Sequence, residues 1–134
     1  QLYNRHFGRI PVAVTGNSAV PPPKYPIGGD QPRVNTGSDT WPLDVAAALT
    51  ADRQSLVVAV VNATQESHEL RLAVEGFRKG PKGRCWQLVA PGLDAQNSLG
   101  KPPQVLIRQE DFDPGARRLA AAPTSIALYE FAAA

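Results

Sequence analysis

Short runs of alternating apolar and polar residues, divided by proline and glycine, constrain this chain more than any other feature. In the run 68–75, leucine or valine fills every second position from Leu70 to Val74, and most of the residues around them are charged. This period of two is that of a strand with one buried face. The 13 prolines and 11 glycines among 134 residues indicate many turns between short elements, and this length fits one domain. The sequence therefore predicts a single all-β domain.

The same alternation predicts about eight strands joined by turns, an antiparallel β-sandwich of the jelly-roll kind. The strands are expected at 10–15, 43–50, 56–62, 68–75, 84–90, 104–108, 117–121 and 124–131. The run 56–62 is apolar on both faces and is predicted to be central, whereas Pro11 places 10–15 at an edge. The predicted core consists of Leu43, Val45, Leu49, Val58, Val60, Leu70, Leu72, Val74, Trp86, Leu88, Val105, Ile107 and Leu128.

Two segments fall outside this pattern. Leu2, Tyr3 and Phe7 can share one face of a short helix, which Gly8 is predicted to end with a left-handed cap. A helix of two turns does not fold alone, so this segment needs packing partners. The segment 16–42 is rich in proline and glycine and is predicted to be a long loop. Loops of this length in compact domains are usually functional or disordered.

Composition argues against several classes of function. The net charge is only +2 with acids and bases interspersed, so nucleic acid is not an expected partner. The longest aliphatic run, 56–61, is far shorter than the roughly twenty residues of a membrane-spanning helix, so no membrane partner is expected either. Cys85 is the single cysteine and has no companion for a disulfide or a zinc site. No cofactor or metal is predicted, and the cellular location stays open.

The residues that could carry chemistry show no catalytic pattern. Glycoside hydrolysis requires two carboxylates about 5 to 10 Å apart, but the five glutamates fall on turns, strand ends or outer strand faces. His6 and His68 stand in no metal or triad motif. The basic stretch 78–84 is interpreted as a hairpin tip, with an anion cradle as the alternative. The triplet Asn62-Ala63-Thr64 matches the N-glycosylation sequon.

Aromatic residues at the long loop give the candidate binding site. Sugar rings stack their C–H faces on Trp and Tyr, and binding sites combine such surfaces with polar groups. Tyr25 and Trp41 flank much of the loop, with Asp30 and Asp39 nearby, and are candidates for carbohydrate contact. The alternative is that both aromatic residues only pin the loop to the sandwich. Trp86, in phase with Leu88, is assigned to the core.

The chain resembles a known domain in three places. The run from Cys85 to Ser98, Cys-Trp-Gln-Leu-Val-Ala-Pro-Gly-Leu-Asp-Ala-Gln-Asn-Ser, followed by prolines and Val105, resembles the C-terminal domain of the α-L-arabinofuranosidases of glycoside hydrolase family 51. The central run 56–62 ends in asparagine as it does in that family. The opening Tyr-Asn-Arg-His-Phe-Gly, 3–8, is similar to the last barrel helix entering the sandwich.

This resemblance implies an accessory role. The parent would be a chain in which a (β/α)8 barrel carries both catalytic glutamates and a non-catalytic β-sandwich braces it. Residues 1–9 would end the last barrel helix, and 10–134 would form the C-terminal sandwich. The family's catalytic glutamates lie on barrel strands, so none is carried over to this chain. A periplasmic or secreted location is suggested only by the polysaccharide substrates of such enzymes.

Two other functions remain open from the sequence. An autonomous carbohydrate-binding module would use Tyr25 and Trp41 to contact polysaccharide, and an immunoglobulin-like adhesion domain would share the sandwich pattern. The opening helix favours the accessory domain, because a binding module has no need of an isolated amphipathic turn.

Overall fold

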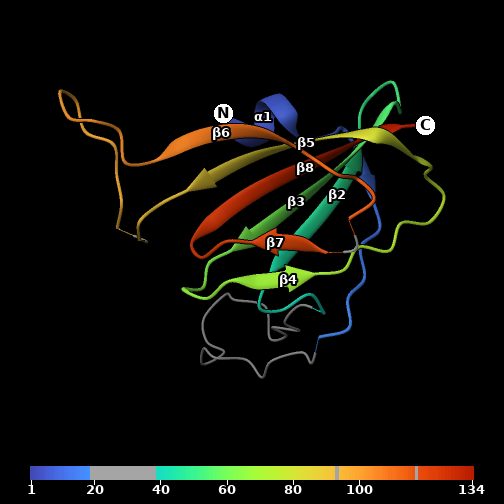
Figure 1. Cartoon of the computed structure of the whole chain (residues 1–134), viewed down its shortest axis with the longest axis horizontal. Coiled ribbons are helices and arrows are strands. Elements are labelled where there is room, and N and C mark those ends of the chain that lie inside the picture. Colours follow the sequence, from blue (N-terminus) through green and yellow to red (C-terminus); the bar gives the residue numbers. More distant parts are fainter. Residues whose placement is uncertain (19–38, 93, 117) are drawn as a thin grey trace, which may run out of the picture.

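The computed structural model describes residues 1–18, 39–92, 94–116 and 118–134. Within them the chain forms eight strands and one short helix (Figure 1). The elements are α1 (Leu2–His6), β1 (Ile10–Val12), β2 (Asp44–Leu49), β3 (Ser55–Asn62), β4 (His68–Leu70), β5 (Lys79–Val89), β6 (Leu106–Phe112), β7 (Leu119–Ala121) and β8 (Ser125–Ala133). The predicted all-β class and the number of strands are confirmed. None of the described helices is long and apolar enough to cross a membrane.

Six strands form one antiparallel sheet in the order β1-β2-β3-β8-β5-β6, and β4 pairs with β7 in a second, two-stranded sheet. β3 pairs with β2 on one side and with β8 on the other, with Val58 opposite Tyr129. This confirms the prediction that the run apolar on both faces lies inside the sheet, because neither of its faces meets water. β1, which contains Pro11, lies at the sheet edge as predicted.

The first core lies between the two sheets. On one face of the large sheet, β3 contributes Val58 and Val60, and β8 contributes Tyr129 and Phe131, all nearly inaccessible to solvent. The β4–β7 pair covers this face (Figure 1). Phe112 of β6 meets the rings of both Tyr129 and Phe131 edge-on. The Tyr129 hydroxyl donates a hydrogen bond to the Ala120 carbonyl of β7, which ties the two sheets together.

The second core lies on the opposite face of the large sheet. Val57, Ala59, Trp86 and Leu128 are buried there, and Leu2 of α1 packs on them. Alternation along β3 thus serves two cores, because its odd and even residues point to opposite faces. Figure 1 shows α1 and the β4–β7 pair on opposite sides of the large sheet.

The predicted left-handed cap at Gly8 is wrong. Phe7 is the C-cap of α1 and has extended backbone angles. A Cβ atom at Gly8 would lie 2.5 Å from the carbonyl oxygen of Leu49 and 2.7 Å from that of Ala48. Glycine is needed here because the chain leaving α1 passes close to the backbone of β2.

Three strand predictions need correction. β4 ends at Leu70, so 71–75 is not strand, although Leu72 and Val74 still pack, half-buried, against the first core. β5 begins at Lys79, so most of the basic stretch is strand and not a hairpin tip. Ile107 was predicted to be core but is 43% exposed. The period of two places its side chain on the second face correctly, but α1 does not extend over it.

Asn62 joins β3 to the turns beside the small sheet. The side chain is 1% exposed, and its Nδ2 donates to the carbonyl oxygens of Glu66, Ala121 and Ala122 at 2.8, 3.1 and 2.9 Å. Its Oδ1 accepts hydrogen bonds from the backbone N–H and the hydroxyl of Thr64. Since the sequon's glycan would attach to this Nδ2, the folded chain cannot be glycosylated at Asn62.

Candidate functional site

The base of the predicted loop contains two of the four predicted carbohydrate-contact residues. Asp39 is exposed, but its carboxylate accepts a hydrogen bond from the Gly16 backbone N–H at 2.8 Å. The Asp39 carbonyl accepts another from the Ser18 N–H at 2.8 Å, and the Ser18 hydroxyl donates to the Trp41 carbonyl. Asp39 therefore joins residues 16 and 18 to residue 39, where the described part of the chain resumes.

The Trp41 side chain is 41% exposed. It therefore keeps accessible surface, as a sugar-contact role would require. The other two predicted residues, Tyr25 and Asp30, lie outside the described residues, so the expected pairing of Tyr25 with Trp41 stays a prediction. Most of the predicted loop 16–42 also lies outside them.

The second face of the large sheet carries a groove beside α1, called here the apolar groove. Its volume is about 540 Å³, and its lining is Gln1, Leu2, Tyr3, Leu88, Asn97, Val105, Leu106, Ile107 and Ile126. Three of these side chains are large and open to solvent: Tyr3 is 40% exposed, Leu106 49% and Ile107 43%. None of the described residues that line the groove has a carboxylate or a basic side chain.

One wall of the apolar groove is shaped by Asn97. The segment between β5 and β6 extends away from the sheet at the left of Figure 1 and leads back into β6. Asn97 Nδ2 donates to the Val105 carbonyl at 2.8 Å, and Asn97 Oδ1 accepts from the N–H groups of Gln104 and Val105 at 2.8 and 2.9 Å. The amide thus clamps both ends of an eight-residue excursion, 98–105, and fixes Val105 beside Leu106.

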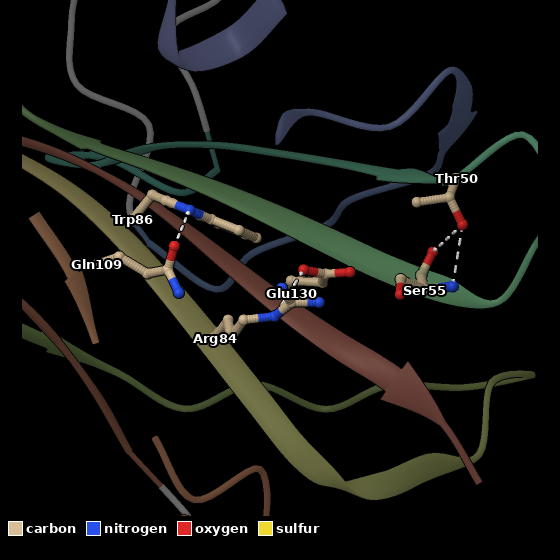
Figure 2. Close-up of polar contacts among 6 residues, drawn as sticks. All are labelled: Thr50, Ser55, Arg84, Trp86, Gln109 and Glu130. Carbon is tan, nitrogen blue, oxygen red and sulfur yellow. Dashed lines mark hydrogen bonds and ion pairs between the residues drawn. The ribbon is translucent and has the colours of Figure 1, made fainter. Parts of the chain in front are cut away.

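A second, more polar hollow of about 430 Å³ lies on the same face, around Trp86. Trp86 Nε1 donates to Gln109 Oε1 at 3.1 Å, and Arg84 forms an ion pair with Glu130 at 3.6 Å (Figure 2). His6 stacks on the Trp86 ring with centroids 4.2 Å apart, and the Arg84 guanidinium lies 5.6 Å from that ring's centroid. Trp86 is thereby engaged at its ring and its N–H, and only 6% of it is exposed, so it offers no open surface to a sugar.

Figure 2 also shows the turn that joins β2 to β3. The Ser55 backbone N–H donates to Thr50 Oγ1 at 3.0 Å, and the Thr50 hydroxyl is 3.3 Å from the Ser55 carbonyl oxygen. Arg53 in this turn has a positive φ of 59°. The turn fixes the register that places Ala48 opposite Val57 beneath α1. Thr50 also lines the polar hollow.

Electrostatics around His6 favour the neutral ring. Burial against Trp86 lowers the pKa of His6 below its ordinary value, and the charge of Arg5 adds to this. Arg84 acts in the same direction, whereas the Glu130 carboxylate opposes it. A neutral imidazole can stack on the indole ring without adding a third positive charge.

Among the described residues, the hollows contain no pair of carboxylates of the kind that cleaves glycosides. The described lining of the apolar groove has none, and that of the polar hollow has Glu130 alone, which is paired with Arg84. Burial raises the pKa of the Cys85 thiol to about 12, so it is protonated at neutral pH and a poor nucleophile. Among the described residues, no three His, Cys, Asp or Glu side chains are grouped so as to hold a metal ion.

Solved structures show what this fold is similar to. The α-L-arabinofuranosidase of glycoside hydrolase family 51 from Thermotoga petrophila matches 66% of this chain at 27% identity, with a TM-score of 0.56. The α-L-arabinofuranosidase of Thermotoga maritima matches 72% at 25% identity with a TM-score of 0.58. A further structure described as an arabinofuranosidase matches 73% at 26% identity with a TM-score of 0.60.

This chain is similar to part of the family 51 α-L-arabinofuranosidases. The resemblance inferred from the sequence is confirmed. The matched region spans only 18% to 20% of the three solved chains. No protein-family model matches the chain, and no curated protein matches it.

Sequence reasoning did not find the apolar groove. The neighbouring apolar residues Leu106 and Ile107 were the available signal, because adjacent strand residues point to opposite faces and one core cannot bury both. Asn97 was part of the run that carried the family resemblance, but its role as a clamp depends on contacts across eight residues that no local pattern reveals.

Proposed function

We propose that this chain is the C-terminal accessory domain of a glycoside hydrolase of the α-L-arabinofuranosidase type, and that it braces a (β/α)8 catalytic barrel of the same parent chain. The observation that carries the proposal is the match to family 51 enzymes at 25% to 27% identity, over 66% to 73% of this chain but at most 20% of theirs. A match to so small a share of these enzymes supports a domain within a larger architecture.

A non-catalytic role agrees with the side chains of the described surface. A glycosidase needs an acid and a second carboxylate on either side of the scissile bond. The only carboxylate among the described residues of the two hollows, Glu130, is paired with an arginine, and Glu69 is paired with Arg118 at 2.6 Å on the exposed side of the small sheet. The catalytic glutamates of the parent would therefore lie on its barrel.

The test uses the complete gene product and the isolated chain. The full-length protein is expected to release nitrophenol from an aryl α-L-arabinofuranoside, and the isolated chain is not. Deleting the domain from the full-length protein should lower its melting temperature and cause loss of activity through unfolding. A full-length protein that keeps both its activity and its melting temperature after the deletion would refute the bracing role.

The second candidate is an autonomous carbohydrate-binding module, favoured by the exposure of Trp41. Tyr25 and Asp30 would complete that surface. Affinity electrophoresis of the isolated chain in gels with and without arabinoxylan separates the two candidates. A polymer-dependent retardation that Trp41→Ala removes favours the binding module, and unchanged mobility favours the accessory domain.

A further inference from the structure

The two faces of the large sheet are covered to very different extents. The first face is closed by the β4–β7 pair, and its central residues Val58 and Val60 are both 1% exposed. The second face is covered by the five residues of α1, which bury Val57 and Leu128 but leave Ile107 43% exposed. Apolar surface is thus left uncovered on the second face beside α1, and Leu106, at the start of β6, borders the same groove although the register of β6 points it to the other face.

The uncovered surface is continuous and shaped. Tyr3, Leu106 and Ile107 expose between 40% and 49% of their area around a single groove, whose remaining lining is mostly aliphatic. Contiguous apolar patches on a protein surface mark interaction sites, whereas isolated apolar residues such as the fully exposed Leu99 do not. The Asn97 side chain makes three hydrogen bonds to the backbone of Gln104 and Val105. These bonds hold Val105 in the wall of the groove and fix the shape of that wall.

We propose that the apolar groove is the surface on which the catalytic part of the parent enzyme docks, and that Asn97 is a positioning residue for its wall. This inference rests on the proposed function and names the surface through which the domain would brace the barrel. Two observations select this occupant. The α1 segment, which the family resemblance predicts to be the end of a barrel helix, contributes Leu2 and Tyr3 to the groove itself. The solved relatives have at least four times more chain outside the matched region than in it, which supplies a partner of sufficient size.

A charge placed in the groove tests the assignment. Leu106→Glu and Ile107→Glu alter exposed side chains, so each should change the melting temperature of the isolated chain by less than about 2 °C. In the full-length enzyme the same carboxylate would be buried without a partner, and the melting temperature should fall by about 5 °C or more. Leu99→Glu is the matched control, because Leu99 is 105% exposed and lies outside the groove. This variant should change the melting temperature of neither the isolated chain nor the full-length enzyme.

The outcomes separate this inference from the proposed function. Equal shifts in the isolated chain and in the full-length enzyme would overturn the docking assignment, even if the enzyme hydrolyses the aryl arabinofuranoside. A dimer of the isolated chain in sedimentation that Leu106→Glu dissociates would overturn it in favour of a second copy of the chain. A full-length protein without glycosidase activity, or a gene without a hydrolase segment, would remove the proposed function and this inference with it.

Substitutions of Asn97 provide an independent test of the docking proposal. Asn97→Ala should speed hydrogen exchange at the amides of Gln104 and Val105 in the isolated chain, because their acceptor is lost. Asn97→Asp keeps that acceptor and should leave these two amides protected. If the groove wall contributes to docking, Asn97→Ala should lower the melting temperature of the full-length enzyme by more than that of the isolated chain. An unchanged melting temperature for full-length Asn97→Ala would show that the wall plays no part in docking.

Discussion

His6 and Trp86 stack face to face, with ring centroids 4.2 Å apart and planes inclined by 21°. His6 is the last residue of α1, and Trp86 lies in the middle of β5. Together with Leu2, which is 6% exposed, this stack holds α1 on the sheet. A helix of five residues has no independent stability, so its place depends on these two contacts.

The stack should make α1 sensitive to acid. Because the folded-state pKa of His6 is lowered, the unfolded chain binds the proton more readily than the folded chain does. The stability from neutral His6 is complete above the ordinary histidine pKa of about 6.5 and is lost as pH falls below that value towards the folded pKa. Urea unfolding between about pH 8 and about pH 5 should show a smaller decline for His6→Gln than for the wild type. His68 is present in both proteins, so the difference between the two pH profiles isolates the effect of His6. Identical pH profiles would contradict the prediction.

Two leucines on opposite faces should differ in what they contribute to stability. Leu128 is 0% exposed in the second core, so Leu128→Ala should lower the free energy of unfolding by about 2 to 5 kcal/mol. Leu72 is only half-buried and lies beyond the end of β4, so Leu72→Ala should lower it by about 1 to 2 kcal/mol. Denaturant titration of both variants gives the comparison. A larger loss for Leu72 would mean that 71–75 contributes more to the first core than its burial indicates.

Asn62 and Asn97 each make three or more hydrogen bonds with their side-chain amides, but one is buried and the other exposed. Asn62→Ala leaves buried carbonyl groups unpaired and should cost about 1 to 3 kcal/mol. Asn97→Ala should cost less than about 0.5 kcal/mol in the isolated chain, because water replaces its partners. Thermal and urea unfolding measure both values. Equal costs would show that burial does not set the difference.

The thiol of Cys85 should report global unfolding. It is 2% exposed, and its pKa of about 12 keeps it protonated. Labelling by a thiol-specific disulfide reagent at neutral pH should therefore be slow in native buffer and should accelerate in parallel with unfolding as urea is added. Cys85→Ser provides the blank. Rapid labelling without denaturant would show that β5 opens locally at this position.

The sequence was sufficient for much of this fold because period and burial coincide in its main strands. The run 56–62 and the alternation around Trp86 predicted strands that the structure contains, and Pro11 marked an edge. The pattern at 68–75 was misleading, since alternation persists after Leu70, where the described pairing with β7 ends. Gly8 was misread because close approach and left-handed geometry both select glycine.

The candidate site was predicted less completely. Exposure of Trp41 is compatible with the sugar-contact hypothesis, but Asp39, chosen as a polar neighbour for the ligand, binds the Gly16 backbone instead. The apolar groove depends on which face of β6 α1 leaves uncovered. That is a matter of tertiary packing, and the sequence period does not contain it.

The sugar-contact hypothesis for Trp41 makes the final prediction. The ring is 41% exposed and belongs to neither core, so Trp41→Ala should lower the free energy of unfolding by less than about 1 kcal/mol. If the ring stacks on substrate chains at the edge of the parent's cleft, the variant full-length enzyme should lose several-fold in kcat/KM on arabinoxylan. Its kcat/KM on an aryl arabinofuranoside should not change, because that substrate is too small to reach Trp41. Gly16→Ala is the comparison variant. Its Cβ would lie 2.1 Å from the Asp39 carbonyl oxygen, so it disturbs the contact between residues 16 and 39 without removing the Trp41 ring. Equal loss on both substrates, together with a fall in melting temperature, would identify Trp41 as a packing residue.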